Sequence, residues 1–96
     1  MKSNEFNYGK YGLMRLRFLK EQHPVRYASL LSSGELSGHL LDINQQAADE
    51  VDRLVDAFVK EVQMPDKNNS PEEWVKEMNA LKHRAEEIIC SKLIYV

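Results

Sequence analysis

The feature that most limits how this chain folds is a long apolar pattern of helical period with no proline inside it. Between residues 36 and 62, hydrophobic residues recur at steps of three or four, which places them on one side of a helix. These residues are Leu36, Leu40, Ile43, Ala47, Val51, Leu54, Phe58 and Val62, and a second row of Leu41, Ala48, Val55 and Val59 widens the stripe. The pattern predicts a helix over 36–63 that must bury a wide side against other helices.

A second helical pattern follows a polar turn and predicts the other half of a hairpin. The turn is "PDKNNS" at 65–70, and Ser70 and Glu73 have the spacing of a capping box around Pro71. The predicted inward row is Trp74, Met78, Leu81, Ala85 and Ile88. Because the turn is short, we expect the helix over 71–93 to pack antiparallel to the helix over 36–63.

Two shorter helices are predicted before the long one. The first, over 10–22, places Tyr11, Met14 and Phe18 on one side and ends at His23-Pro24. The alternation in "LMRLRFL" also fits a short strand, although the helical spacing fits better. The second helix, over 24–32, stops at Gly34. Its expected inward residues are Val25, Ala28 and Leu31, with Tyr27 and Leu30 beside them.

These segments predict an all-α fold, a compact bundle of about four helices whose last two form a long antiparallel hairpin. The chain has 96 residues, enough for one core. Residues 9–96 are therefore interpreted as a single helical domain and residues 1–8 as an N-terminal tail. No apolar run has signal-peptide or membrane-spanning length, and the single cysteine, Cys90, permits no internal disulfide. These features are typical of a cytoplasmic protein without membrane contact.

Charge is distributed unevenly along the chain. Residues 1–33 carry a balance of +4 and residues 34–96 a balance of −6. The candidate nucleic-acid contacts are Lys10, Arg15, Arg17, Lys20 and Arg26. Lys10, Arg17 and Lys20 share one helix face, and such a stripe can neutralise phosphates and release counterions. The alternative is a solvated helix face, with Arg15 and Arg17 paired to acids of the long helix.

A helix-turn-helix is another way in which this chain could meet DNA. It would cover residues 26–46 with its turn at Gly34, and its outward side chains would be His39, Asp42, Gln45 and Gln46. Glutamine can read adenine edges. However, no arginine or lysine lies between residues 35 and 50, and Asp42 would face phosphate, which argues against this interpretation.

No pattern in the sequence indicates a catalytic or metal site. His83 has Glu86 and Glu87 on its own helix, but one helix supplies too few metal ligands, so ion pairs within the helix are expected. Cys90 is interpreted as a packed thiol and Trp74 as a core residue. No cofactor and no small-molecule substrate is indicated, and the chain is not expected to be an enzyme.

Several segments together resemble the transposon-encoded TnpV family, small proteins of mobile elements in Gram-positive bacteria. The resemblance covers about residues 5–96 and rests on "GKYG", the "LKE" that ends the first helix, "SLLxSGxL", "DRLV", "WVxxMN" and the terminal "AEEI…LIY". The chain departs from the family pattern at "HPV", residues 23–25, where relatives often have a more basic run. The resemblance implies a mobile-element context and brings no catalytic residues with it.

The expected function follows from the helical pattern and this resemblance. We expect a non-enzymatic accessory protein of a transposon or other mobile element that acts through protein–protein contacts. Its partner would be an unknown protein or a second copy in a homodimer, because wide apolar stripes on a small bundle leave surface uncovered. The alternative is a DNA-binding recombination or transcription accessory factor that uses the basic face of the first helix.

Overall fold

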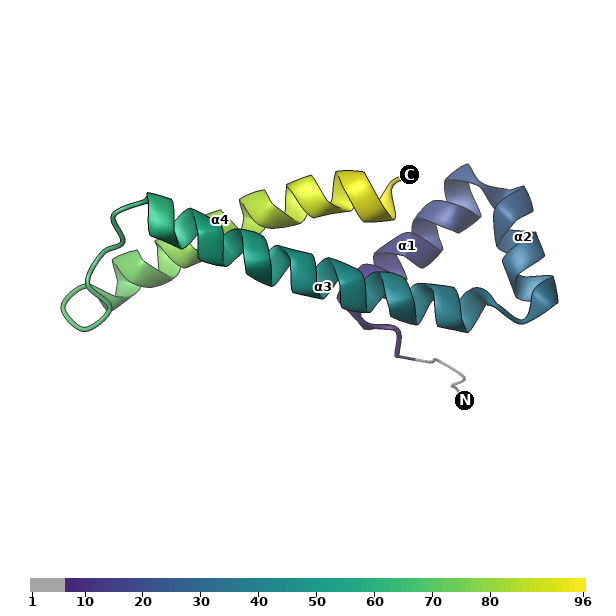
Figure 1. Cartoon of the computed structure of the whole chain (residues 1–96), viewed down its shortest axis with the longest axis horizontal. Coiled ribbons are helices and arrows are strands. Elements are labelled where there is room, and N and C mark those ends of the chain that lie inside the picture. The colour runs from purple at the N-terminus through teal and green to yellow at the C-terminus, as the bar shows by residue number, and fades with distance from the viewer. Residues whose placement is uncertain (1–6) are drawn as a thin grey trace.

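The computed structural model describes residues 7–96, and every regular element in that range is a helix (Figure 1). The helices are α1 (Gly9–Gln22), α2 (Pro24–Ser33), α3 (Leu36–Glu61) and α4 (Pro71–Ile89), and a π-helical turn, η1 (Cys90–Ile94), continues α4. The predicted all-α fold of four helices is confirmed, with bounds close to those expected. Of the predicted tail over 1–8, residues 1–6 lie outside the described residues, and Asn7 and Tyr8 precede α1.

The antiparallel hairpin of α3 and α4 dominates the shape of the molecule (Figure 1). α3 has 26 residues, which corresponds to about 39 Å at 1.5 Å per residue. The molecule measures 53 × 31 × 19 Å along its principal axes, so the bundle is elongated. The physical reason is that α1 and α2 are short and do not reach the part of the hairpin next to its loop.

The core consists of two clusters that both involve α1. The larger cluster joins α1 to α3 and to the C-terminal end of the hairpin, and contains Tyr11, Ala47, Val51, Ala85, Ile89, Cys90 and Ile94. The smaller cluster joins α1 to the start of α3 through Leu19, Leu36 and Leu40. Each fully buried leucine or isoleucine contributes about 1.5–3 kcal/mol to stability. α1 and α3 therefore both contribute buried residues to the two clusters.

α2 packs with a different side from the one predicted. Val25 is 82 % exposed, Leu31 is 56 % exposed and Ala28 is also on the surface, whereas Tyr27 and Leu30 pack against the smaller cluster. The inward row predicted for this helix was wrong. Tight turns at both ends, with Gly34 in the left-handed conformation at φ 79°, fix the rotation of this ten-residue helix.

The loop between α3 and α4 is organised by Asp66 rather than by the predicted capping box. The two carboxylate oxygens of Asp66 accept hydrogen bonds from Asn68 N and Asn69 Nδ2, at 2.9 and 2.8 Å, and its carbonyl accepts from Ser70 N at 2.7 Å. Ser70 does occupy the N-cap position, but its side chain makes no capping hydrogen bond. The glutamates at 72 and 73 still complement the positive end of α4.

The last turn of the hairpin is wider than an α-helix. In η1 the backbone N–H of Tyr95 donates to the carbonyl oxygen of Cys90, at 2.9 Å. A π-helical turn accommodates an extra residue and so changes where the following side chains point. Ile94 is fully buried in the larger core, and the Tyr95 ring lies 5.5 Å from the Phe18 ring between centroids. η1 thereby fastens the end of the hairpin to α1.

Candidate functional site

The five bases predicted to contact nucleic acid do not form one surface. Arg15 is only 2 % exposed, so it is a core residue and cannot present its guanidinium to a phosphate on the surface. Arg15 was a candidate contact beside the basic face, but it lies on the side of α1 that packs on the core. Lys10, Arg17, Lys20 and Arg26 are exposed.

The buried guanidinium of Arg15 joins three elements. Its Nη1 donates to the carbonyl oxygens of Ile94 and Val96, at 2.8 and 2.7 Å, and its Nε donates to His39 Nε2 at 3.2 Å. These partners are not the acids of α3 that the sequence interpretation offered. Because the carbonyls that follow a helix end have no partner within the helix, a long donor from α1 can satisfy them. Arg15 therefore closes the C-terminal end of the hairpin onto α1.

His39 must stay neutral to accept this hydrogen bond. Burial lowers the pKa of His39 below its ordinary value of 6.5, and the positive charges of Arg15 and Arg26 lower it further, against a small opposing effect of Asp42. Burial, with the charge of Arg26, also lowers the pKa of Arg15, whose guanidinium nevertheless stays charged. In the helix-turn-helix alternative His39 would point outward, whereas in the structure its side chain is half-buried against α1.

We expect the protein to lose stability as the pH falls below about 6.5. His39 takes up a proton near pH 6.5 in the unfolded chain but at lower pH in the folded chain. Between these values the unfolded state binds more protons, so the free energy of unfolding falls with falling pH. Unfolding midpoints at pH 7.5 and 5.5 would measure the effect. His39→Gln should reduce the difference between the two midpoints, and the exposed His83→Gln should not. If both variants showed the same difference, the role given to His39 would be contradicted.

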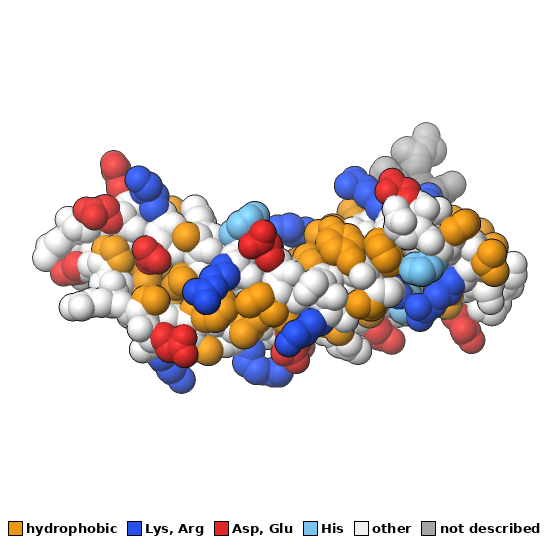
Figure 2. Space-filling view, turned by 90° about the horizontal axis from the view of Figure 1, so that it is seen from above, with side chains coloured by type: hydrophobic (Ala, Val, Ile, Leu, Met, Phe, Trp, Pro, Cys, Tyr) orange, Lys and Arg blue, Asp and Glu red, His pale blue; other side chains and the backbone are white. Residues whose placement is uncertain are grey.

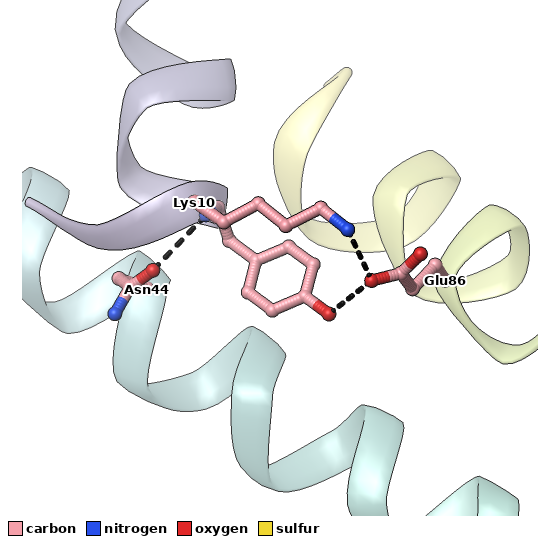
Figure 3. A network of polar contacts seen from close by, with 4 residues as sticks. Lys10, Asn44 and Glu86 are labelled. Carbon is pink, nitrogen blue, oxygen red and sulfur yellow. Dashed lines mark hydrogen bonds and ion pairs between the residues drawn. The ribbon is translucent and has the colours of Figure 1, made fainter. Parts of the chain in front are cut away.

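A polar network lies where α1 begins and connects it to both helices of the hairpin (Figure 3). Glu86 Oε2 accepts from Lys10 Nζ and from the Tyr11 hydroxyl, both at 2.7 Å. Asn44 Oδ1 accepts from the backbone N–H groups of Tyr11 and Gly12, at 3.0 and 3.2 Å. Asn44 thus caps α1 from another helix, since the first N–H groups of a helix have no partner within it.

In this network, Lys10 and Glu86 have a structural role, because their contact joins α1 to α4. Burial alone would raise the pKa of Glu86, but the hydrogen bonds from Lys10 and Tyr11 and the positive charges of Lys10 and Lys82 outweigh it, and the pKa is lowered. Burial and the bond to Glu86 raise the pKa of Tyr11. The sequence interpretation had paired Glu86 with its own helix, and nothing in the spacing along the chain indicated that α1 would reach it.

The basic surface that remains comprises Arg17 and Lys20 on α1 and Arg26 on α2. Among residues 7–96, none of these three side chains makes an ion pair with an acid. The Lys20 ammonium lies 5.6 Å from the centroid of the Tyr27 ring, within cation–π range. The nucleic-acid contact proposed for these residues stays a prediction.

The remaining candidate residues have ordinary structural roles. His83 lies 3.9 Å from Glu87 on the same helix, as expected, and no cluster of metal-binding side chains occurs within residues 7–96. Cys90 is buried, and burial together with the charge of Glu86 raises the pKa of its thiol, which disfavours the reactive thiolate. Trp74 is only half-buried, with the Lys67 ammonium 4.8 Å from its ring centroid.

The end of the hairpin forms what we call the arm, residues 52–62 of the chain with residues 71–82. No residue in it except Leu81 is buried, although apolar side chains follow both helices. Figure 2 shows hydrophobic side chains on the surface there, with acidic and basic side chains around them. On one side of the arm lies a groove of about 520 Å³. It is lined by Asp52, Val55, Asp56, Met78, Asn79 and Lys82.

Among residues 7–96, no helix is long and apolar enough to cross a membrane. Comparison with curated proteins and with solved structures found no match. A family model described as "Transposon-encoded protein TnpV" matches residues 1–94. The match covers nearly the whole chain and includes the residues of the polar network, the buried arginine and the arm. The chain therefore belongs to the family of the transposon-encoded protein TnpV.

Proposed function

We propose that this protein is a cytoplasmic, non-enzymatic accessory factor of its transposon that acts by binding other protein chains through the arm. The observation that carries this proposal is the uncovered apolar surface of the arm. Val75 is 48 % exposed and Val62 37 % exposed there, and Val55 and Met78 line an open groove. A chain this small gains stability by covering such a surface, and uncovered apolar patches commonly mark protein interfaces.

The polar residues support a binding role rather than catalysis. Lys10 and Tyr11 donate to Glu86 and so join α1 to α4, and Arg15 donates through Nη1 and Nε to carbonyl oxygens and to His39. Cys90 is the one thiol of the chain, and it is buried. A catalytic site needs acid, base or nucleophilic groups that converge on a space open to a substrate. The arm groove has acids on α3 and an ammonium on α4 but no such arrangement.

The proposal can be tested by measuring how often the transposon is excised in a host that carries it. Deleting the coding sequence of this chain should change the excision frequency, and Val75→Glu on the arm should have the same effect as the deletion. A carboxylate at an apolar contact weakens binding by about tenfold or more. Val25→Glu is the matched control, because Val25 is more exposed than Val75 and lies on α2. If the deletion leaves the frequency unchanged, the proposal is wrong.

DNA binding through Arg17 and Lys20 is the second candidate function. It is favoured by their exposure on one side of α1 without acidic partners in the described part of the chain. In the same assay, Arg17→Glu combined with Lys20→Glu should then reproduce the deletion while Val75→Glu should not. A purified chain should also bind duplex DNA with an affinity that falls steeply with salt. The two variants thus separate the two functions.

A further inference from the structure

The arm groove is the open continuation of a groove that α1 already fills. Tyr11 is buried between α3 and α4, in the cluster that contains Val51 and Ala85. Its hydroxyl bonds to Glu86, and the negative charge of Asp52 also acts on it, so the first turn of α1 lies beside the first residue of the arm groove. α1 begins at Gly9 and runs away from the loop (Figure 1). No described helix lies over the groove beyond this point.

The shape of this groove suits a helix. Its lining residues come from successive turns of α3 and α4, as do the residues that hold α1 farther along the hairpin. Val59 follows Val55 by four residues on α3, Val62 comes directly after that helix, and Val75 precedes Met78 by three on α4, so the apolar strip continues toward the loop. From Asp52 to Val62 it is about 15 Å long at 1.5 Å per residue.

On the opposite side of the hairpin, one apolar side chain of the arm is shielded by a charged one. The Arg84 guanidinium lies over the Phe58 ring, 4.7 Å from its centroid, and Arg53 pairs with Glu50 at 2.9 Å. A guanidinium stacked on an aromatic ring shields that ring from water. On the groove side, Val55 and Met78 line an open hollow, so apolar side chains are available for docking there.

The charges along the groove indicate what binds there. Asp52 and Asp56 form its edge on α3, while Lys82 forms its edge on α4, and all three are exposed. A two-fold axis parallel to the groove would place the α3 edge of one chain against the α4 edge of the other. Both edges would then meet an opposite charge, so the surface is complementary to itself.

We infer that the arm binds the arm of a second copy of this chain, side by side around a two-fold axis, to form a four-helix bundle between two protomers. This inference rests on the protein-binding role proposed above and names one partner for it. In the dimer, Val55 and Met78 are covered from both chains, and each Lys82 faces the acidic edge of the other chain. Antiparallel helix pairs commonly bury their apolar sides in this arrangement.

The dimer should depend on concentration. The groove is short, and its contact is smaller than the roughly 800 Å² per partner of a standard interface. We expect a dissociation constant in the micromolar range, about 1–100 μM. Light scattering after size exclusion should therefore give a mass that rises from monomer to dimer as the loading concentration increases through this range.

Charge reversal on the two edges tests the inference directly. One chain carries Asp52→Lys and Asp56→Lys, and the other carries Lys82→Glu. Each alone should stay monomeric, because two-fold pairing brings like charges together twice. When the two chains are mixed, every edge meets an opposite charge, so a dimer with one chain of each kind should form. Native mass spectrometry distinguishes this dimer by its mass.

Two controls make the result decisive. Lys76→Glu changes the same residue type on α4 at an exposed position that does not line the groove, and it should dimerise like the unmodified chain. Circular dichroism should show that each variant keeps its helices. The inference is overturned if the unmodified chain stays a monomer at every concentration, if the variants dimerise alone, or if their mixture does not dimerise.

The outcome also separates this inference from the proposed function. If the chain stays a monomer but Val75→Glu still reproduces the deletion, the arm binds a different protein, and only the dimer is wrong. If the mixed dimer forms but deleting the chain leaves excision unchanged, the dimer stands and the accessory role is wrong.

Discussion

Replacing Arg15 by alanine should lower the free energy of unfolding by about 3 kcal/mol, a large effect for a chain of this size. The carbonyl oxygen of Ile94 would lose its donor in a buried place, which costs about 1–3 kcal/mol, and the more exposed carbonyl oxygen of Val96 would lose its donor too. The removed side chain would also leave a cavity between the two core clusters. Chemical denaturation of both proteins would measure the difference.

Arg17→Ala is the matched control, because Arg17 lies on the same helix two residues away and is exposed. Its effect should stay within about 0.5 kcal/mol, the usual range for surface substitutions. Equal losses for the two variants would show that Arg15 does not have the buried role described above. The comparison also bears on nucleic-acid binding, since an Arg15 variant could lose DNA affinity simply by unfolding.

Replacing Gly12 by alanine should destabilise the protein by about 2 kcal/mol, although alanine is the better helix former. A Cβ atom at Gly12 would lie 2.7 Å from Tyr8 Cβ and 3.0 Å from the Leu40 carbonyl oxygen. The carbonyl belongs to the backbone of α3 and cannot move aside, so α1 would have to shift away from α3. This shift would stretch the capping bonds from α1 to Asn44, and the thermal unfolding midpoint should fall.

Gly38→Ala should have the opposite sign. Gly38 lies in the first turns of α3, and nothing stands within 4 Å of the place where its Cβ would be. The same substitution there should stabilise the protein by about 0.5–1 kcal/mol, because alanine loses less backbone entropy on folding. If both variants were stabilised, the close approach of α1 to α3 would be contradicted.

The two glycines of "GKYG" explain why this short motif matters to the fold. Gly9 adopts φ +83°, and a Cβ there would overlap the side chain of Asn44. Gly12 allows the close approach to Leu40. The motif thus lets the start of α1 enter the groove between α3 and α4, where Lys10 and Tyr11 reach Glu86. Its spacing in the sequence marked the family, but only the packed helices show its purpose.

The candidate site was predictable to different degrees. Arg17, Lys20 and Arg26 are exposed, as the amphipathic pattern of the chain predicted. Arg15 was expected on the surface because it is charged. The pattern along the chain does not show that its long side chain reaches the carbonyl oxygens of other segments. The α2 side chains were misplaced for a related reason. A ten-residue helix with small apolar residues on several sides carries too little pattern to fix its rotation.

The sequence by itself determined the four helices, their ends and the antiparallel hairpin. Periodic apolar residues, prolines at the first helical positions and a left-handed glycine act within a few residues of chain, so they can be read without the fold. Only the tertiary structure decided which polar groups meet and which apolar surface stays open. The Arg15 bond to Ile94 and the Lys10 bond to Glu86 join residues more than seventy positions apart. The arm stays uncovered because α1 and α2 are shorter than the hairpin on which they pack.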